Sequence, residues 1–513
     1  MKLTLADLLR RALARSATRT ALRVGDASWT YSDLDSMSDS LASGLSRLGI
    51  AQGDFVALYL KNSAEYVVAD LAILKIGAIK VPLNEYQSAS EAAYILQDTS
   101  AATLVAHQSL VAGLATVFAK HVSLPRIICV PEEACETPRL PHHWWDEVLE
   151  NEPFAAADTS PEDIALITYT GGTTGRPKGV VQRQASLAVN LWAHVTAGEI
   201  GASEVMLLAT PLPHSAGYHL QAGLLQGSEI VLHGKFDPAT FCSVIEQCKV
   251  TWTFLVPTMI YRLLDHLELA AQDHSSLRTV VYGAAPMSGA QLKRAIEKFG
   301  HCFIQLYGQT ECPNYITVLG KDDHRNPNLH ESCGKAVPFV DLATSASDRK
   351  GLGEVIVRSP YMLSEYFDNP ESTRLALKDG WLHTGDIGYI NEEGYLFLKD
   401  RAKDMIISGG MNVYTSEVEQ VIKRHPAVAD AAVVGLPHED WGEMVHAVVE
   451  TRNHDEVSED ALIDYCKGRL STYKVPKTIE FRAALPLTAY GKVDKKVLRS
   501  NPGSAMHRAG SLA

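Results

Sequence analysis

The feature that most limits the fold is an alternation of strand-like and helix-like segments. Residues 54–60 (DFVALYL) form an apolar run typical of a buried strand, residues 63–76 read as a helix, and residues 78–83 (AIKVPL) again read as a strand. A second unit of this kind covers residues 278–307. Repeated units of strand, helix and strand predict parallel sheets flanked by helices. We therefore expect an α/β fold.

Two short motifs follow strands of the second unit. GAAP (283–286) comes directly after the strand-like RTVVY, and YGQTE (307–311) begins where CFIQLY ends. In parallel α/β sheets, ligands bind beyond the carboxyl ends of the strands. These two motifs therefore predict a binding edge.

The length of the chain and a change in its local composition near residue 400 predict more than one domain. A chain of 513 residues exceeds the ~100–200 residues of an ordinary domain. Near residue 400 the sequence becomes charged and then glycine-rich, and a compact α/β stretch follows, in which Ser416 and Glu419 fit a capping box. We place the boundary at about 400–404, giving predicted domains 1–400 and 401–513, and we expect the tail from Ser500 to fray.

Composition narrows the possible partners. The 47 Lys and Arg residues against 60 Asp and Glu residues give a net charge of -13, which argues against nucleic acid or an anionic membrane as the main partner. No apolar run approaches the ~20 residues of a membrane span. The eight cysteines form no CxxC pair, so we expect reduced, mostly buried thiols in a cytoplasmic protein and no zinc site. The amphipathic N-terminus favours a docking helix over a transit peptide.

A glycine- and threonine-rich loop has the composition of a phosphate-binding site. It reads YTGGTTGRPKG over residues 169–179, where glycines allow close backbone approach and hydroxyls and a lysine add donors. The spacing is not that of a P-loop, and the following GVVQRQ is strand-like rather than helical. A glycine-rich hairpin without a ligand is the alternative for this loop taken alone.

Together with four further segments, this loop resembles the adenylate-forming superfamily of acyl- and aryl-CoA synthetases, free-standing adenylation domains and beetle luciferases. The other segments, in that family's order, are YGQTE, GWLHTGDIG (380–388), KDRAKDMIISGGMNVYTSEVE (399–419) and AYGKVDKK (489–496). The resemblance implies a large N-terminal domain that binds ATP and acid, and a small mobile C-terminal α/β domain. It also implies a two-step reaction: a carboxylate attacks MgATP to give an acyl-adenylate and pyrophosphate, and the thiol of CoA then takes the acyl group.

The resemblance assigns the ATP-binding residues. The loop residues around the β- and γ-phosphates would be Thr170, Gly171, Gly172, Thr173, Thr174 and Gly175, with Lys178 neutralising charge. Gly283, Ala284 and Ala285 would lie along the adenine, Tyr307 would stack on it, Gln305 would read its edge, and Asp386 and Arg401 would hold the ribose.

The resemblance also assigns the chemistry. Lys492 would steady the transition-state charge, Thr310 would bind the α-phosphate and Glu311 would help hold Mg²⁺. Lys403 would be the hinge, and Ser408, Gly409 and Gly410 would line the CoA channel. The acid pocket would include His214, with Gly308 near the carboxylate and Tyr218 and His219 as further candidates.

Some alternatives stay open. Lys495 and Lys496 lie close to Lys492, so only the GKV register favours Lys492 over a solvated lysine. The chain has Thr415 where the family usually has proline, and Leu487 where it tends to have a basic residue. An enzyme that stops at adenylation, transfer to a carrier protein, a luciferase-like oxidoreductase and a non-enzymatic nucleotide-binding protein remain rivals. We expect aryl or cyclic acids before medium-chain fatty acids, and a homodimer only from the family resemblance.

Overall fold

The computed structural model describes most of the chain and divides it into two compact units. The described residues are 3–118, 125–133, 135–170, 177–267, 272–345, 351–401, 403–408, 411–438, 441–452, 457–467, 469–488 and 492–501. The first unit comprises Met1–Leu342 and Val357–Leu382, and the second comprises Ala343–Ile356 and His383–Ala513. The predicted boundary near residue 400 lies inside the second unit, so the assignment of functional roles to 1–400 and 401–513 stays a prediction.

One sheet of the first unit is built mainly from parallel strands. Its order is β19 (Glu365–Tyr366), β9 (Lys178–Arg183), β8 (Ile164–Thr170), β4 (Ile79–Pro82), β3 (Phe55–Tyr59), β5 (Thr103–His107), β6 (Arg126–Val130), β7 (His143–Trp144). β3 pairs in parallel with both β4 and β5, whereas β8 and β9 form an antiparallel hairpin. Helices α4 (Ala89–Asp98) and α5 (Gln108–Phe118) share a hydrophobic core with this sheet.

The other sheet of the first unit carries GAAP and YGQTE at the predicted binding edge. Its order is β16 (Lys335–Ala336), β15 (Cys312–Leu319), β14 (Phe303–Gln309), β13 (Thr279–Tyr282), β12 (Trp252–Leu255), β10 (Val205–Leu208), β11 (Glu229–Leu232), β1 (Thr20–Val24), β2 (Ala27–Thr30). The strands from β14 to β1 pair in parallel, which confirms the predicted parallel sheet. Helices α9 (Pro238–Cys248), α10 (Pro257–Leu267) and α11 (Gly289–Phe299) pack on it through a core that includes Phe241, Ile260 and Leu292.

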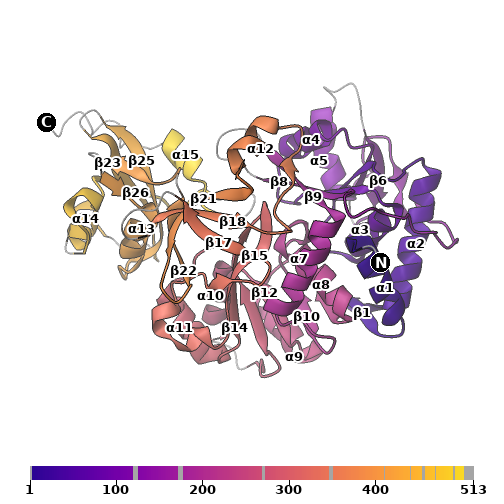
Figure 1. Ribbon diagram of the computed structural model, residues 1–513, viewed down its shortest axis with the longest axis horizontal. Helices are drawn as coiled ribbons and strands as arrows, with labels where there is room; N and C mark the ends of the chain where they lie inside the picture. Colours follow the sequence, from indigo (N-terminus) through magenta and orange to yellow (C-terminus); the bar gives the residue numbers. More distant parts are fainter. Residues whose placement is uncertain are drawn as a thin grey trace. The chain divides into compact units, whose positions relative to one another are not determined.

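Two helices connect these sheets. α7 (Gln184–Ala197) contacts β9 of the first sheet and β15 of the second, and α8 (Gly217–Gln226) packs beside it (Figure 1). A π-helical turn, Leu212–Ala216, leads into α8, and it is kinked at His214, whose φ of -119° and ψ of -146° are not helical. These contacts bring segments that are distant in sequence to the edge where GAAP and YGQTE end their strands.

Helices near the N-terminus complete the unit. α3 (Ala64–Ile76) is buried on almost every side, begins at the Ser63 cap and ends at Gly77, whose φ of 74° suits glycine. α1 (Leu5–Arg15) packs against α2 (Tyr31–Arg47), α3, α7 and α8, and buries Leu5 and Leu9. The predicted docking helix is confirmed. No helix in the described residues is long and apolar enough to cross a membrane.

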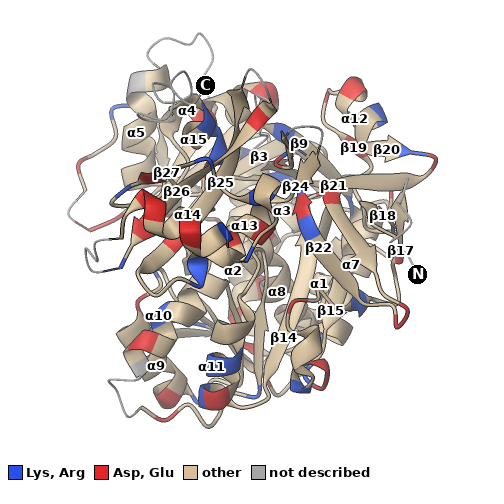
Figure 2. Ribbon diagram, turned by 90° about the vertical axis from the view of Figure 1, so that its left-hand side faces the viewer, with Lys and Arg blue, Asp and Glu red and all other residues tan. Residues whose placement is uncertain are grey.

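The second unit is a smaller α/β assembly. Its sheet runs β24 (Met411–Val413), β23 (Ile406–Ser408), β26 (Gly442–Thr451), β25 (Val428–His438), with β27 (Thr478–Phe481) on β26. α13 (Thr415–Lys423) and α14 (Glu459–Lys467) pack on one core, and Leu498 of α15 (Lys495–Ser500) joins another. Figure 2 shows acidic residues along α14. The residues of a further sheet are divided between the units. Its order is β17 (Asp341–Ser345), β18 (Gly353–Arg358), β21 (Trp381–Ile390), β20 (Leu377–Lys378), with β22 (Leu396–Arg401) on β21.

The predicted capping box at Ser416 is wrong. α13 begins at Thr415, and its N-cap is Tyr414, whose side chain makes no capping hydrogen bond; the Thr415 N–H donates to the Asp400 carboxylate instead. The Ser416 hydroxyl instead donates to the Lys399 carbonyl, and Glu419 accepts from the Val433 N–H at 2.9 Å. Long-range partners therefore occupy both side chains that the local pattern assigned to the helix end.

Candidate active site

The glycine-rich loop connects two antiparallel strands. β8 ends at Thr170 and β9 begins at Lys178, and these two residues pair across the hairpin. The strand after the loop confirms that it differs from a P-loop, which opens into a helix. Gly171, Gly172, Thr173, Thr174 and Gly175 lie outside the described residues.

A tyrosine that the sequence did not single out connects this hairpin to YGQTE. The Tyr366 hydroxyl donates to Glu311 Oε1 at 2.7 Å, and Lys178 Nζ lies 5.3 Å from the centre of the Tyr366 ring. β19 places this ring, because Tyr366 pairs with Val180 just beyond the loop. Burial and the adjacent Glu311 carboxylate raise the pKa of Tyr366, so its phenol stays protonated and donates. No local pattern could have revealed this contact between residues 55 positions apart.

Glu311 suits a magnesium ion that also binds phosphate. It is partly exposed in the turn between β14 and β15, and the described residues provide no hydrogen bond to its Oε2. The described residues hold no cluster of three or more His, Cys, Asp or Glu able to form a complete metal cage. Mg²⁺ ordinarily uses one or two carboxylates, substrate phosphates and water, so a lone carboxylate with a free oxygen fits it.

The predicted adenine segment has the backbone of a ligand-contacting turn. Gly283 directly follows β13 and lies so close to Leu306 that an added Cβ would be 2.5 Å from its Cδ1. Ala284 follows with a φ of 67°, a left-handed conformation uncommon for alanine, and it is exposed, as is Ala285. Gln305 is buried and its Oε1 accepts from the Tyr282 hydroxyl at 3.2 Å. The structure therefore brings the predicted adenine residues of β13 and β14 to neighbouring strand ends.

Thr310 and Glu311 form the two-residue turn between β14 and β15, since Gln309 pairs with Cys312. Tyr307 and Gly308, at the irregularity before this turn, are partly exposed. A Cβ on Gly308 would lie 2.6 Å from the backbone of Asn314, so glycine is required for this close approach. The motif is therefore the tight end of a hairpin, with Thr310 and Glu311 partly exposed in its turn.

The predicted acid-pocket residues lie around the π-helical turn. His214 sits within it, and its Nε2 lies 2.9 Å from Asn84 Nδ2. Tyr218 is one turn further, and its hydroxyl donates to Gln182 Oε1 at 3.0 Å. His219 has no exposed surface: its ring stacks on Phe254 and its Nδ1 lies 2.9 Å from the Ser215 carbonyl oxygen. His214 and Tyr218 remain partly exposed, whereas His219 in this conformation is a core residue.

In the second unit, the predicted ribose-binding pair forms an ion pair. Asp386 and Arg401 face each other across β21 and β22, with Arg401 Nε 2.9 Å from Asp386 Oδ1. Asp386 is buried and Arg401 is about half exposed. Gly385, with a φ of 71°, precedes Asp386, and its N–H donates to Glu354 Oε1 at 3.0 Å. The turn of the TGD motif is therefore held by a carboxylate from β18.

Lys492 lies in the same unit at the base of a short hairpin. Its N–H donates to the Thr488 hydroxyl at 3.3 Å, and Leu487 bridges to Val493. The pKa of Lys492 is lowered to about 8 by partial desolvation and by the nearby positive charges of Arg401 and Lys403. The negative charge of Asp386 acts in the other direction and raises this pKa. Because its side chain is exposed, the two cations are the firmer cause. The structure thus groups Lys492 with the predicted ribose pair and with the predicted hinge residue Lys403.

The other predicted residues of this unit are placed less fully. Lys403 is exposed in the turn after Arg401, where desolvation and then Arg401 lower its pKa. Ser408 ends β23 and is buried, and its hydroxyl has no partner in the described part of the chain. Gly409 and Gly410 lie outside the described residues. The hinge and channel assignments stay predictions.

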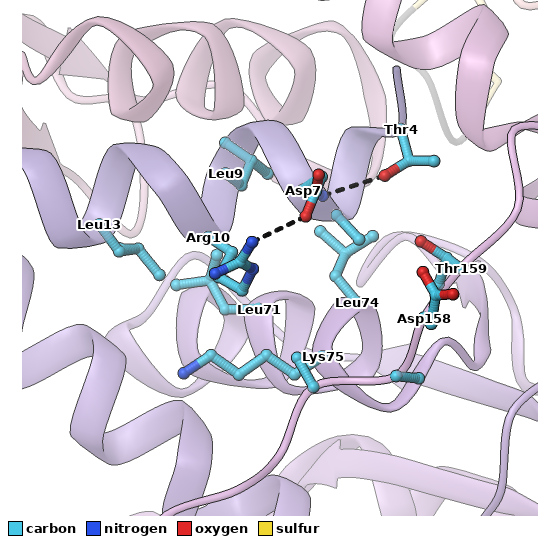
Figure 3. Close-up of a pocket in the computed structure, with 13 residues that line it drawn as sticks. Thr4, Asp7, Leu9, Arg10, Leu13, Leu71, Leu74, Lys75, Asp158 and Thr159 are labelled. Atoms are coloured by element: carbon cyan, nitrogen blue, oxygen red, sulfur yellow. Dashed lines mark hydrogen bonds and ion pairs between the residues drawn. The ribbon is translucent and has the colours of Figure 1, made fainter. Parts of the chain in front are cut away.

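A cavity elsewhere in the first unit is separate from these residues. It has a volume of about 330 Å³ and lies between α1 and α3, beside Asp158 and Thr159 (Figure 3). Asp7 and Arg10 pair at its wall at 2.9 Å, and Lys75 is held by Asp39 at 2.5 Å. None of the predicted site residues lines it.

Comparisons with known proteins agree with the geometry. The sequence pattern described as AMP-binding enzyme matches residues 9–367, and that of the AMP-binding enzyme C-terminal domain matches residues 417–492. The medium/long-chain-fatty-acid–CoA ligase FadD8 of Mycobacterium tuberculosis is 35% identical, covering 96% of this chain and 89% of its own. Feruloyl-CoA synthase of Amycolatopsis sp is 34% identical, covering 94% and 96%. The amide bond synthetase McbA of Marinactinospora thermotolerans has a similar structure, with a TM-score of 0.86, 32% identity and coverage of 97% and 99%.

Proposed function

Because the chain belongs to the AMP-binding enzyme family, it is an ATP-dependent, AMP-forming ligase of carboxylic acids and CoA, and we propose that its acid is aryl or cyclic. The observation that carries the first half-reaction is the contact of Tyr366 with Glu311 and Lys178, which joins the phosphate hairpin to YGQTE. His214 and Tyr218, both partly exposed around the same turn, support an acid with a ring, because aromatic side chains pack well on flat rings.

In the first half-reaction, a carboxylate oxygen attacks the α-phosphorus and pyrophosphate leaves. Thr310 donates to the α-phosphate, Lys178 neutralises the departing phosphates, and Lys492 stabilises the negative charge that grows on the α-phosphate oxygens. Glu311 would hold Mg²⁺, which would neutralise phosphate charge. Asp386 and Arg401 orient the ribose, and Ala284 and Tyr307 enclose the adenine.

In the second half-reaction, the CoA thiol attacks the acyl carbonyl and AMP leaves with the electron pair of the broken bond. Ser408, Gly409 and Gly410 would border the thiol's path, since glycines admit a narrow pantetheine arm. Lys403 would absorb the backbone change between the half-reactions, an alternation of the C-terminal domain.

A pyrophosphate-release screen with ferulate, cyclohexanecarboxylate, octanoate and palmitate tests the acid class, with mass spectrometry of the CoA product. We expect the highest kcat/KM with ferulate or cyclohexanecarboxylate, and a thioester of that acid. A preference for octanoate or palmitate would overturn the acid class. Acyl-AMP that accumulates without thioester in the presence of CoA would overturn CoA as the acceptor.

One alternative acceptor has support among similar structures. McbA is an amide bond synthetase, so an amine is a second candidate acceptor for this chain. Adding amines or a phosphopantetheinyl carrier protein to the screen separates these acceptors. Transfer to a carrier protein, a homodimer and a cytoplasmic location stay predictions, and no observation favours a luciferase-like oxidation.

A further inference from the structure

A buried asparagine connects the acid-binding turn to the YGQTE hairpin. Asn314 lies on β15, three residues after Glu311, and is 6% exposed. Its Nδ2 lies 2.8 Å from His194 Nε2 and donates to the Ser215 carbonyl at 3.3 Å, and its Oδ1 accepts from the Ser215 hydroxyl at 2.8 Å. Both amide hydrogens and the amide oxygen are thus engaged.

The orientation of this amide is fixed by its neighbours. His194 Nδ1 lies 2.8 Å from the Asn190 carbonyl oxygen, so Nδ1 carries the proton and Nε2 accepts from Asn314. Burial lowers the pKa of His194 to about 4, so this ring stays neutral around neutral pH. The Asn190 side chain donates to the Pro313 carbonyl at 3.0 Å, which ties α7 to β15 a second time.

The backbone of Asn314 touches the other side of the predicted acid site. Gly308 packs against it so closely that no Cβ would fit. Ser215, held by the Asn314 side chain, is adjacent to His214 in the π-helical turn. The separation of His214 from Gly308 therefore depends on Asn314.

We propose that Asn314 is a positioning residue that fixes the acid-binding turn Leu212–Ala216 against Gly308 and so sets the affinity for the carboxylic acid. This inference rests on the proposed function of that site. Asn314 itself contacts neither ATP nor the acid in this proposal. Because it holds the acid-binding turn, its loss changes the KM for the acid far more than the KM for ATP.

A backbone-neutral substitution tests the proposal. Asn314 has a φ of 61°, which glycine adopts readily, so Asn314→Gly removes the amide without straining the chain. The probe acid is the one among ferulate, cyclohexanecarboxylate and octanoate that the parent adenylates fastest. We expect its KM to rise about tenfold while the KM for ATP changes by less than about twofold. Lys249→Gly, also at a left-handed position but exposed at the C-cap of α9, is the matched control and keeps both constants.

A second variant removes one bond only. Ser215→Ala deletes the donor to Oδ1, and we expect a smaller rise in acid KM that adds little to that of Asn314→Gly in the double variant. Equal changes in both KM values, or an unchanged acid KM in folded Asn314→Gly, would overturn the proposal. If Asn314→Gly does not fold, the KM ratio of Ser215→Ala decides. A parent enzyme that adenylates no acid would count against the proposed function instead.

Discussion

At the residue scale, three lysines near the chain end differ in their surroundings. Lys495 forms an ion pair with Glu419 at 2.7 Å and donates to the Thr415 hydroxyl at 2.6 Å, so its charge is neutralised by a partner within the second unit. Lys496 is exposed, and Lys492 stands near Asp386 and Arg401. The sequence separated these lysines only by motif register, whereas the structure shows that Lys495 has a structural partner.

The first prediction concerns the charge of Lys492. Lys492→Ala should lower the rate of adenylation by about 10²–10³-fold, the usual effect of removing one group that stabilises transition-state charge. Pyrophosphate release measures it, and Lys496→Ala is the matched control. Thioester formation from synthetic acyl-AMP and CoA should persist in Lys492→Ala. Equal losses in both half-reactions would show that this lysine has a general structural role.

The second prediction concerns pH. Because the pKa of Lys492 is lowered to about 8, the ammonium is present below that pH and lost above it. The kcat/KM for adenylation should therefore fall as pH rises through about 8, and this limb should be missing from the residual activity of Lys492→Ala. A rate that stays level up to pH 10 in the parent would contradict the assignment.

The third prediction concerns Tyr366. Tyr366→Phe removes the hydrogen bond to Glu311, and a bond to a charged group contributes about 1.5–3 kcal/mol. The Mg²⁺ concentration for half-maximal activity should rise several-fold, with the acid KM little changed. Tyr86→Phe, at a tyrosine that is 53% exposed, is the control. An unchanged Mg²⁺ dependence would mean that Tyr366 does not position Glu311.

At the element scale, the sequence predicted the strands and helices of the βαβ units well. α3 covers Ala64–Ile76 against the predicted 63–76, because Ser63 and Gly77 give clear start and stop signals. β14 extends to Gln309, beyond the predicted end at 307, because antiparallel pairing with β15 continues it. Contacts such as Tyr366 with Glu311 join segments distant in the chain, so no local pattern contains them.

The fourth prediction concerns the start of α13. The Thr415 N–H donates to Asp400 and its hydroxyl accepts from Lys495. The proline that the family usually has would suit the first position of the helix. It would stabilise the folded protein by about 0.4–1 kcal/mol, because it restricts the conformations of the unfolded chain. Losing the bond to Asp400 costs about 1.5–3 kcal/mol. Thr415→Pro should therefore lower the free energy of unfolding by roughly 1–2 kcal/mol in urea titrations, and Thr415→Ser should not. A more stable proline variant would contradict this network.

At the scale of the whole molecule, the predicted site residues are divided between the two compact units. The first unit holds the residues predicted to bind phosphate, adenine and acid, and the second holds Asp386, Arg401 and Lys492. The sequence placed the division near residue 400, where its texture changes, whereas packing places His383 and the residues after it in the second unit. Pairing of β21 with β22 explains this difference, because it binds Asp386 to Arg401 across the predicted boundary.

The most direct test of the central claim follows an oxygen atom. If the acid carboxylate attacks the α-phosphorus, an acid labelled with ¹⁸O in its carboxyl group must transfer one labelled oxygen to AMP during thioester formation. We predict AMP and pyrophosphate as products, with one ¹⁸O atom in each AMP, measured by mass spectrometry. ADP as the nucleotide product, or AMP without label, would contradict an acyl-adenylate intermediate.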